Sequence, residues 1–195
     1  MSVRSQENFL IHAMNIGFDK AALSFSQLIK RPVKIVHSQS ILIHHKNDFS
    51  YVAEEQGELY VLTTHIIGSI SGKSFLILSK EECEEIFSAL GTSVKNDVLR
   101  EAFLLEIDNI ISASVISELA NSLSLEIYGD VPKLYKVDAR QIQDFLFHEI
   151  KGENSASVIF SNTTFQFDKD KVHPQFIWSL SNKIFEINSF EKISA

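Results

Sequence analysis

The sequence FLILSKEECEEIFSAL at residues 75–90 and the sequence FIWSLSNKIFEINSF at residues 176–190 follow the same pattern. Each begins with an apolar run rich in aromatic and β-branched residues, which is typical of a buried strand. Each then changes to a mixed polar and apolar segment, and in the first copy this segment has the periodicity of an amphipathic helix. Glutamates stand in its first turn, where the helix macrodipole favours them. The two copies predict a chain built from two similar halves.

Upstream of the first copy, the sequence predicts two helices followed by three strands. One short helix is expected over residues 5–16 and a second over residues 19–30, with Asp19 as its N-cap. The helix that begins at residue 80 is expected to end at Gly91, because glycine is the residue most often found just after a helix. Alternating apolar and polar residues predict the strands at 33–43, 58–70 and 73–79.

The second half repeats this order. Helices are expected over residues 96–111 and 114–124, followed by an extended stretch at 125–137. An amphipathic helix at 138–150, with Asp138 as its cap, has no counterpart in the first half, and it could cover a sheet edge, form a dimer or contact a partner. Further strands are predicted at 155–163, 164–168 and 174–181.

These elements make two helix–helix–strand–strand–strand repeats, the first over about residues 5–91 and the second over about residues 96–190. Either half alone would leave one face of its strands exposed to water, so the halves are expected to share one sheet. The sequence therefore predicts one α+β domain over residues 1–195 with pseudo-two-fold symmetry.

Composition excludes several classes of function. The formal net charge is −7 and no run of clustered basic residues occurs, which argues against a nucleic-acid-binding protein. Cys83 is the only cysteine and the histidines lack the HxxxH spacing, so neither a disulfide framework nor a metal site of its own is expected. No apolar run reaches the length of a membrane span, and we expect a cytoplasmic protein that does not bind membranes.

The sequence LLEIDNIISAS at residues 104–114 places polar residues inside an otherwise apolar helix. On a helical wheel Glu106 and Asn109 share one narrow stripe with alanines, while Asp108 falls on what should be a solvated side. An exposed glutamate and a tolerated polar residue within a helix would explain this pattern without any function. The alternative is a binding or catalytic site, since small neighbours would let another surface approach closely.

The second half resembles the CheC/CheX/FliY family of chemotaxis phosphatases. That family's motif is Asp or Ser, three residues, Glu, two residues, Asn, twenty-two residues and Pro, and Glu106, Asn109 and Pro132 stand at this spacing. Ala102 departs from the motif at its first position. The resemblance covers nearly the whole chain and implies the family's CheC-like two-layer sandwich.

The first half carries only a degenerate copy of the motif. Asn15 stands at the asparagine position, but His12 replaces the glutamate, Asn8 takes the first position and Ser38 takes the position of the proline. We therefore expect one site, in the second half.

The resemblance implies a phosphatase that removes phosphate from the aspartyl phosphate of a CheY-type response regulator. The Asn109 carboxamide would position the attacking water, Glu106 would pair with the regulator's active-site lysine, and Pro132 would be structural. No cofactor of its own is implied, because the phosphorylated receiver supplies Mg²⁺.

Two alternatives stay open. The chain could be a non-catalytic CheC-like binding module for a receiver, or for a CheD-type partner that contacts residues 114–124. The chain could also self-associate through an exposed strand edge without any receiver, and the sequence leaves open whether it is a monomer or a homodimer.

Overall fold

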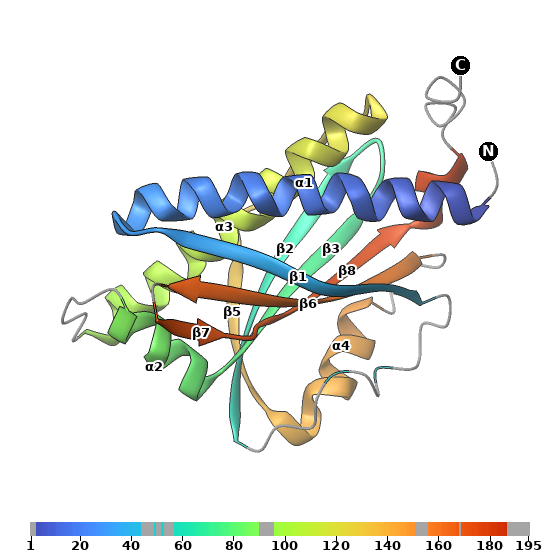
Figure 1. Cartoon of the computed structure of the whole chain (residues 1–195). Coiled ribbons are helices and arrows are strands. Elements are labelled where there is room, and N and C mark those ends of the chain that lie inside the picture. The colour runs from blue at the N-terminus through green and yellow to red at the C-terminus, as the bar shows by residue number, and fades with distance from the viewer. Residues whose placement is uncertain are drawn as a thin grey trace.

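The computed structural model describes residues 3–43, 49, 52, 57–89, 96–150, 156–167 and 169–186. Within them the elements follow in the order α1 (Val3–Ile29), β1 (Val33–Ile43), β2 (Glu58–Gly68), β3 (Gly72–Ser79), α2 (Lys80–Ala89), α3 (Asp97–Leu123), β4 (Ile127–Gly129), β5 (Lys133–Asp138), η1 (Ala139–Gln141), α4 (Ile142–Ile150), β6 (Ala156–Phe167), β7 (Asp170–Val172), β8 (Gln175–Ser181) and η2 (Asn182–Glu186). The strands join into one curled antiparallel sheet, with the long helices α1 and α3 lying against it (Figure 1).

The two halves of the chain interlock within this sheet. Its strand order is β1-β6-β8-β3-β2-β4, with β5 also paired to β2 and β7 to β6. The equivalent strands β3 and β8 lie together at the centre, and each half contributes its outer strand to the other half, since β1 pairs with β6 while β4 and β5 pair with β2. The predicted α+β fold, with one sheet shared by two pseudo-symmetric halves, is confirmed.

The predicted pairs of short helices are wrong, because each pair is one continuous helix of 27 residues. Gly17 does not break α1. It lies where α1 meets α3, and a Cβ atom at this position would come within 2.6 Å of the Val115 Cα atom. Asp19 is an exposed residue within the helix rather than a cap. In α3 the Ser114 hydroxyl donates to the Ile110 carbonyl at 2.7 Å, a bond that lets serine stay inside a helix.

Several of the strand predictions also differ from the structure. The strands expected at 155–163 and 164–168 are the single strand β6 in the described residues, and the short strand β7 was not predicted. The extended stretch at 125–137 is two strands, β4 and β5, separated by residues 130–132. The helix α2 is described only to Ala89, so the expected end at Gly91 lies outside the described residues.

The main core lies between the sheet and the pair α1 and α3. Large aromatic side chains fill it, and many of their rings meet edge to face, a geometry that aromatic pairs favour. The Phe18 ring centroid lies 5.2 Å from that of Phe176 and 6.3 Å from that of Trp178, and the Phe25 centroid lies 6.0 Å from that of Phe165. These five side chains are fully buried.

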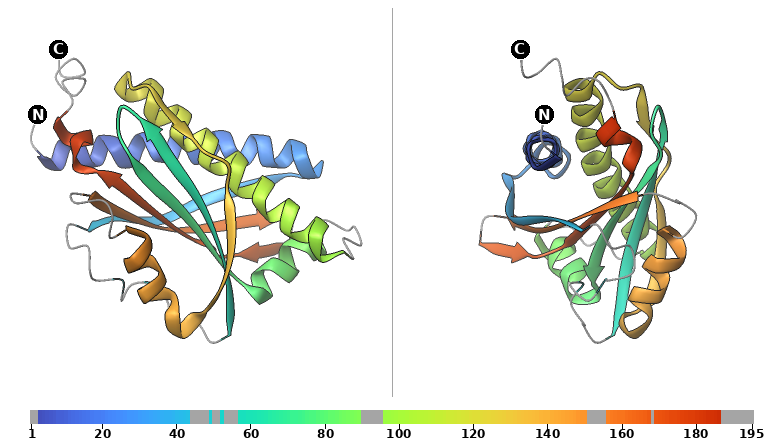
Figure 2. Two further views of the ribbon diagram at one scale, coloured as in Figure 1. Left: turned by 180° about the vertical axis from the view of Figure 1, so that it is seen from behind. Right: turned by 90° about the vertical axis from the view of Figure 1, so that its right-hand side faces the viewer.

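The 138–150 segment covers the opposite face of the sheet rather than an edge. Asp138 accepts a hydrogen bond from the Arg140 amide at 2.9 Å, as an N-cap does, at the start of η1, and α4 follows. Its buried residues Ile142, Leu146 and Ile150 join a second apolar cluster with alternate residues of β2, β3, β6 and β8. Figure 2 shows α4 on the other side of the sheet from α1 and α3. The helix therefore adds a partial third layer to the two-layer packing.

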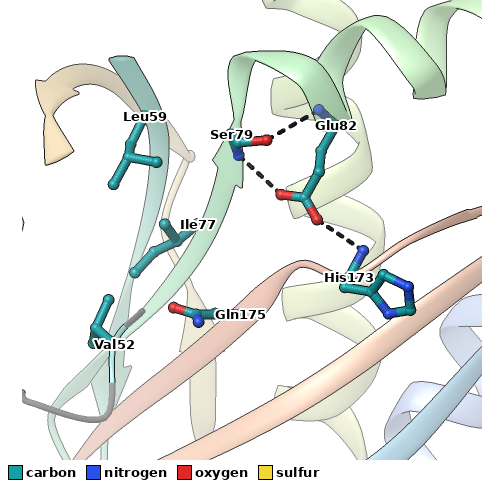
Figure 3. A pocket seen from close by; sticks show the side chains of 7 residues that line it. All are labelled: Val52, Leu59, Ile77, Ser79, Glu82, His173 and Gln175. Atoms are coloured by element: carbon teal, nitrogen blue, oxygen red, sulfur yellow. Dashed lines mark hydrogen bonds between the residues drawn. The ribbon is translucent and has the colours of Figure 1, made fainter. Parts of the chain in front are cut away.

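A reciprocal capping box fixes the start of α2. The Ser79 hydroxyl accepts from the Glu82 amide at 3.1 Å, and the Glu82 carboxylate accepts from the Ser79 amide at 2.9 Å. The other oxygen of Glu82 accepts from the His173 amide at 2.7 Å, which ties α2 to the loop after β7 (Figure 3). These residues also line a small pocket, and the hydrogen bonds that fix the start of α2 explain why polar side chains gather there.

The length and composition of the helices determine whether one of them could cross a membrane. Neither 27-residue helix, nor any other helix in the described part of the chain, combines the length and the apolar character that crossing a bilayer requires.

Candidate functional site

A shallow groove runs between the outward face of α3 and the connection from β4 to β5. Its volume is about 360 Å³, and both Glu106 and Asn109 line it from α3. Ala102 lies one turn earlier on the same wall, and Pro132 stands on the opposite wall with residues 129–131. The structure thus brings together the motif residues from two separate elements.

The packing of α3 explains why the polar pair faces outward. Leu104, Ile107 and Ile111 are buried in the main core, which turns positions 106 and 109 toward solvent. Neither Glu106 nor Asn109 makes a side-chain hydrogen bond to another described residue. Both side chains are therefore available to another molecule.

The ends of α3 are also fixed. At its N-terminus the Asn96 side chain accepts from the Val98 amide at 2.9 Å, and at its C-terminus Ser124 takes the left-handed conformation with φ 53°. These caps satisfy backbone groups that would otherwise lack partners at the helix ends. The helix is a rigid support for the groove.

The second wall is a tight turn held against β2. The Asp130 amide donates to the His65 carbonyl at 2.8 Å, and the Asp130 carboxylate accepts from the Val131 amide at 2.7 Å. Val131 is 76% exposed at the rim of the groove. The motif spacing did not single out Val131 or Asp130, although the polar turn before Pro132 could have indicated a loop at this place.

Asp108 does not lie on the solvated side of its helix, although the helical wheel predicted this position. Its side chain is fully buried at 0% exposure, and one carboxylate oxygen accepts from the Thr64 hydroxyl at 2.7 Å. Burial raises the pKa of Asp108 to about 7, although the hydrogen bond from Thr64 lowers it in part. The helical wheel failed because α3 packs on both α1 and the sheet, so its buried arc is wider than one apolar stripe.

The degenerate copy in the first half is arranged differently from the motif in the second half. His12 is exposed on α1, while Asn15 is half-buried and its Oδ1 atom is buried without a hydrogen-bond partner. Ser38, at the position equivalent to Pro132, lies inside the continuous strand β1, where only a register shift between His37 and Gln39 interrupts the pairing. In the second half a turn separates β4 from β5 at the equivalent place, and that turn is what forms the second wall.

The other reactive or charged residues near the start of α3 do not form a second chemical site. Burial and the nearby Glu82 raise the pKa of the Cys83 thiol to about 12, which makes it a poor nucleophile. Arg100 and Lys136, near the start of α3, form ion pairs with Glu84 at 2.7 Å and Glu101 at 2.8 Å. Among the described residues, no three His, Cys, Asp or Glu side chains gather in a way that could hold a metal ion.

Solved structures with the same fold come from chemotaxis and flagellar proteins. Thermotoga maritima FliY matches with a TM-score of 0.73 and 18% identity, over 98% of this chain and 96% of that chain. A chain of the FliG–FliM complex from H. pylori matches with a TM-score of 0.62 and 7% identity, over 92% and 94%. A chain of the CheX–CheY–BeF3–Mg²⁺ complex from Borrelia burgdorferi matches with a TM-score of 0.50 and 14% identity, over 85% and 96%.

The chain therefore has the CheC/CheX/FliY-like fold. A scan against protein-family models finds no match, and a search of curated proteins finds no relative.

Proposed function

We propose that this protein dephosphorylates a phosphorylated CheY-type response regulator in the cytoplasm. The observation that carries the proposal is the groove, which gathers Glu106, Asn109 and Pro132 from α3 and from the β4–β5 turn. The fold adds support, because CheX has this fold and is found in a complex with CheY.

Asn109 is the proposed catalytic residue. Its exposed carboxamide can donate and accept at the same time, so it can hold a water molecule in line with the phosphorus atom of an aspartyl phosphate. This role needs no change of protonation state. The receiver would supply Mg²⁺, which neutralises charge on the phosphoryl group, and this chain would supply the geometry of the attack.

Glu106 is the proposed docking residue. It lies one turn before Asn109 and forms no ion pair with another described residue, so its carboxylate is free to pair with the receiver's active-site lysine. Leu105, Val131 and Pro132 give the groove an apolar lining, and Val98 and Leu99 are exposed at the start of α3, one turn before Ala102. Exposed apolar side chains beside a groove are common in protein-binding surfaces.

Phosphate release from phosphorylated receivers tests the proposal. The wild-type protein should accelerate release, and Glu106→Ala should raise KM more than it lowers kcat because the docking contact is lost. Glu126→Ala, which removes an exposed glutamate beyond the end of α3, is the matched control. The proposal fails if wild-type protein accelerates release from none of the receivers tested.

A non-catalytic binding module is the second candidate, and Ala102 favours it. The family motif has Asp or Ser at this position, and an exposed alanine there removes one polar group from the groove. FliM, which shares the fold, occurs in a complex with FliG. A CheD-type partner could instead contact the C-terminal half of α3, where Ser117 and Asn121 are exposed. Receiver binding that survives Asn109→Ala, without turnover by the wild type, would select this candidate.

A further inference from the structure

Asp108 is a buried acid without a cationic partner. Its Oδ2 atom accepts from the Thr64 hydroxyl, while its Oδ1 atom is buried and has no hydrogen-bond partner. An uncompensated carboxylate is costly at such a place, so the group is expected to hold a proton where an ordinary aspartate would not. Asp108 directly precedes the proposed catalytic residue Asn109, and this position suggests a role in the site.

Thr64 lies between the two walls of the groove. Its hydroxyl group reaches Asp108 on α3, and its Cγ2 atom would lie 3.2 Å from a Cβ atom placed on Gly129. Gly129 begins the turn that leads to Pro132, and the next residue of that turn, Asp130, is bonded to the carbonyl of His65, the neighbour of Thr64. A chain of contacts therefore runs from α3 through β2 to the opposite wall.

We propose that Asp108 is a positioning residue, which, through its hydrogen bond with Thr64, sets the distance between the Asn109 wall of the groove and the wall at residues 129–132. This inference rests on the proposed function for its catalytic consequence. Ionised Asp108 would have a buried oxygen with no donor, so ionisation favours separation of α3 from β2. The wider groove would then hold the Asn109 carboxamide away from the phosphoryl group.

Within the described part of the chain, no charged group faces this carboxyl from the elements packed against α3. The nearest titratable and charged side chains on those elements are exposed, or lie on the other face of the sheet, or pair elsewhere in the described residues. These side chains are His12, Asp19 and Lys20 on α1, Glu58 and His65 on β2, Tyr128 on β4, Asp130 in the turn, and Lys133 and Lys136 on β5. Tyr60 on β2 is half-buried on the α3 side, but it lies by the start of that helix, with Lys136 over its ring. The titration is therefore controlled by burial and by Thr64.

The test is an NMR titration of wild-type protein, which needs no receiver. The carboxyl carbon of Asp108 should titrate near pH 7, and the Asn109 side-chain amide and the amides of residues 129–131 should shift with the same midpoint. His65 is a second titrating group close to this turn, and burial and Lys73 lower its pKa below 6.5. The His65→Gln variant removes that contribution.

Three variants make the result specific. Asp108→Asn should abolish the shared transition and leave the His65 transition in place. Thr64→Val should move the midpoint upward because the hydrogen bond from Thr64 lowers the pKa of Asp108, whereas Thr64→Ser, which keeps the hydroxyl, should not. The inference is overturned if the signals at Asn109 and 129–131 do not follow the Asp108 midpoint, or if they still follow it in Asp108→Asn.

The pH dependence of phosphate release tests the catalytic consequence. Wild-type activity should fall as the pH rises above about 7, and the Asp108→Asn profile should lack this fall. Equal profiles for the two proteins would overturn the positioning role, since a purely structural residue would not change the shape of the pH profile. Failure of the wild type to act on any receiver would instead overturn the proposed function, while the NMR titration would still decide the link between the two walls.

Discussion

The burial of Asp108 predicts how the stability of the protein depends on pH. Its pKa rises from 3.8, the ordinary value, to about 7 in the folded state, a change of about three pH units. One unit corresponds to about 1.4 kcal/mol, so the proton contributes about 4 kcal/mol to the stability of the folded state. Because the folded pKa is raised, this contribution is fully present below about pH 4 and is lost as the pH rises to about 7.

The variant Asp108→Asn isolates this effect. It keeps the shape of the side chain and an oxygen that can accept from Thr64, but it cannot ionise. The unfolding free energy of the variant minus that of the wild type should increase by about 1.4 kcal/mol per pH unit between about pH 4 and about pH 7.

Urea unfolding followed by circular dichroism at several pH values measures the difference. Asp144→Asn, at an exposed position on α4, controls for the loss of a negative charge at the surface. A difference between Asp108→Asn and wild type that stays constant from pH 4 to pH 7 would refute the claim that Asp108 is protonated within the folded protein.

Three further predictions concern packing and capping. Gly17→Val should destabilise the protein by roughly 1–3 kcal/mol, because a Cβ atom there would meet the Val115 backbone at 2.6 Å, and thermal unfolding measures this loss. Ser79→Ala should cost about 1 kcal/mol in urea unfolding because half of the capping box of α2 is removed. Leu146→Ala should cost roughly 2–5 kcal/mol if α4 packs on the sheet as described, whereas the exposed Gln143→Ala should cost less than about 0.5 kcal/mol.

Local patterns predicted much of the fold. The strands β1, β2, β3 and β8 follow runs rich in apolar residues, and the repeat around residues 75–90 and 176–190 correctly indicated two halves that share one sheet. The pairing of β1 with β6 across the halves could not be read from the sequence, because it joins segments far apart in the chain.

The errors have a common physical origin. Gly17 and Asp19 resemble a helix boundary when only local preferences are considered, but contact with α3 holds α1 helical through both residues. The helix at 138–150 was correctly expected, yet its place on the second face of the sheet depends on residues of five strands. Tertiary packing decided each of these features.

The candidate site, like the fold, was predicted only in part from the sequence. The resemblance to the family motif identified Glu106, Asn109 and Pro132 by their spacing, and the structure places all three at one groove. Spacing could not reveal that Asp108 is buried, because its burial depends on α1 and β2 both packing against α3. Asp108 and Thr64 became visible only when the contact between the helix and the strand was known.

The most direct test of the proposed function compares the two halves of the protein. In a single-turnover assay with a phosphorylated receiver, Asn109→Ala should slow dephosphorylation on the order of 100-fold, because the attacking water is no longer positioned. Asn15→Ala changes the equivalent asparagine of the degenerate copy and should leave the rate close to that of the wild type. Equal rates for Asn109→Ala and wild type, or equal losses in both variants, would contradict the assignment of Asn109 as the catalytic residue.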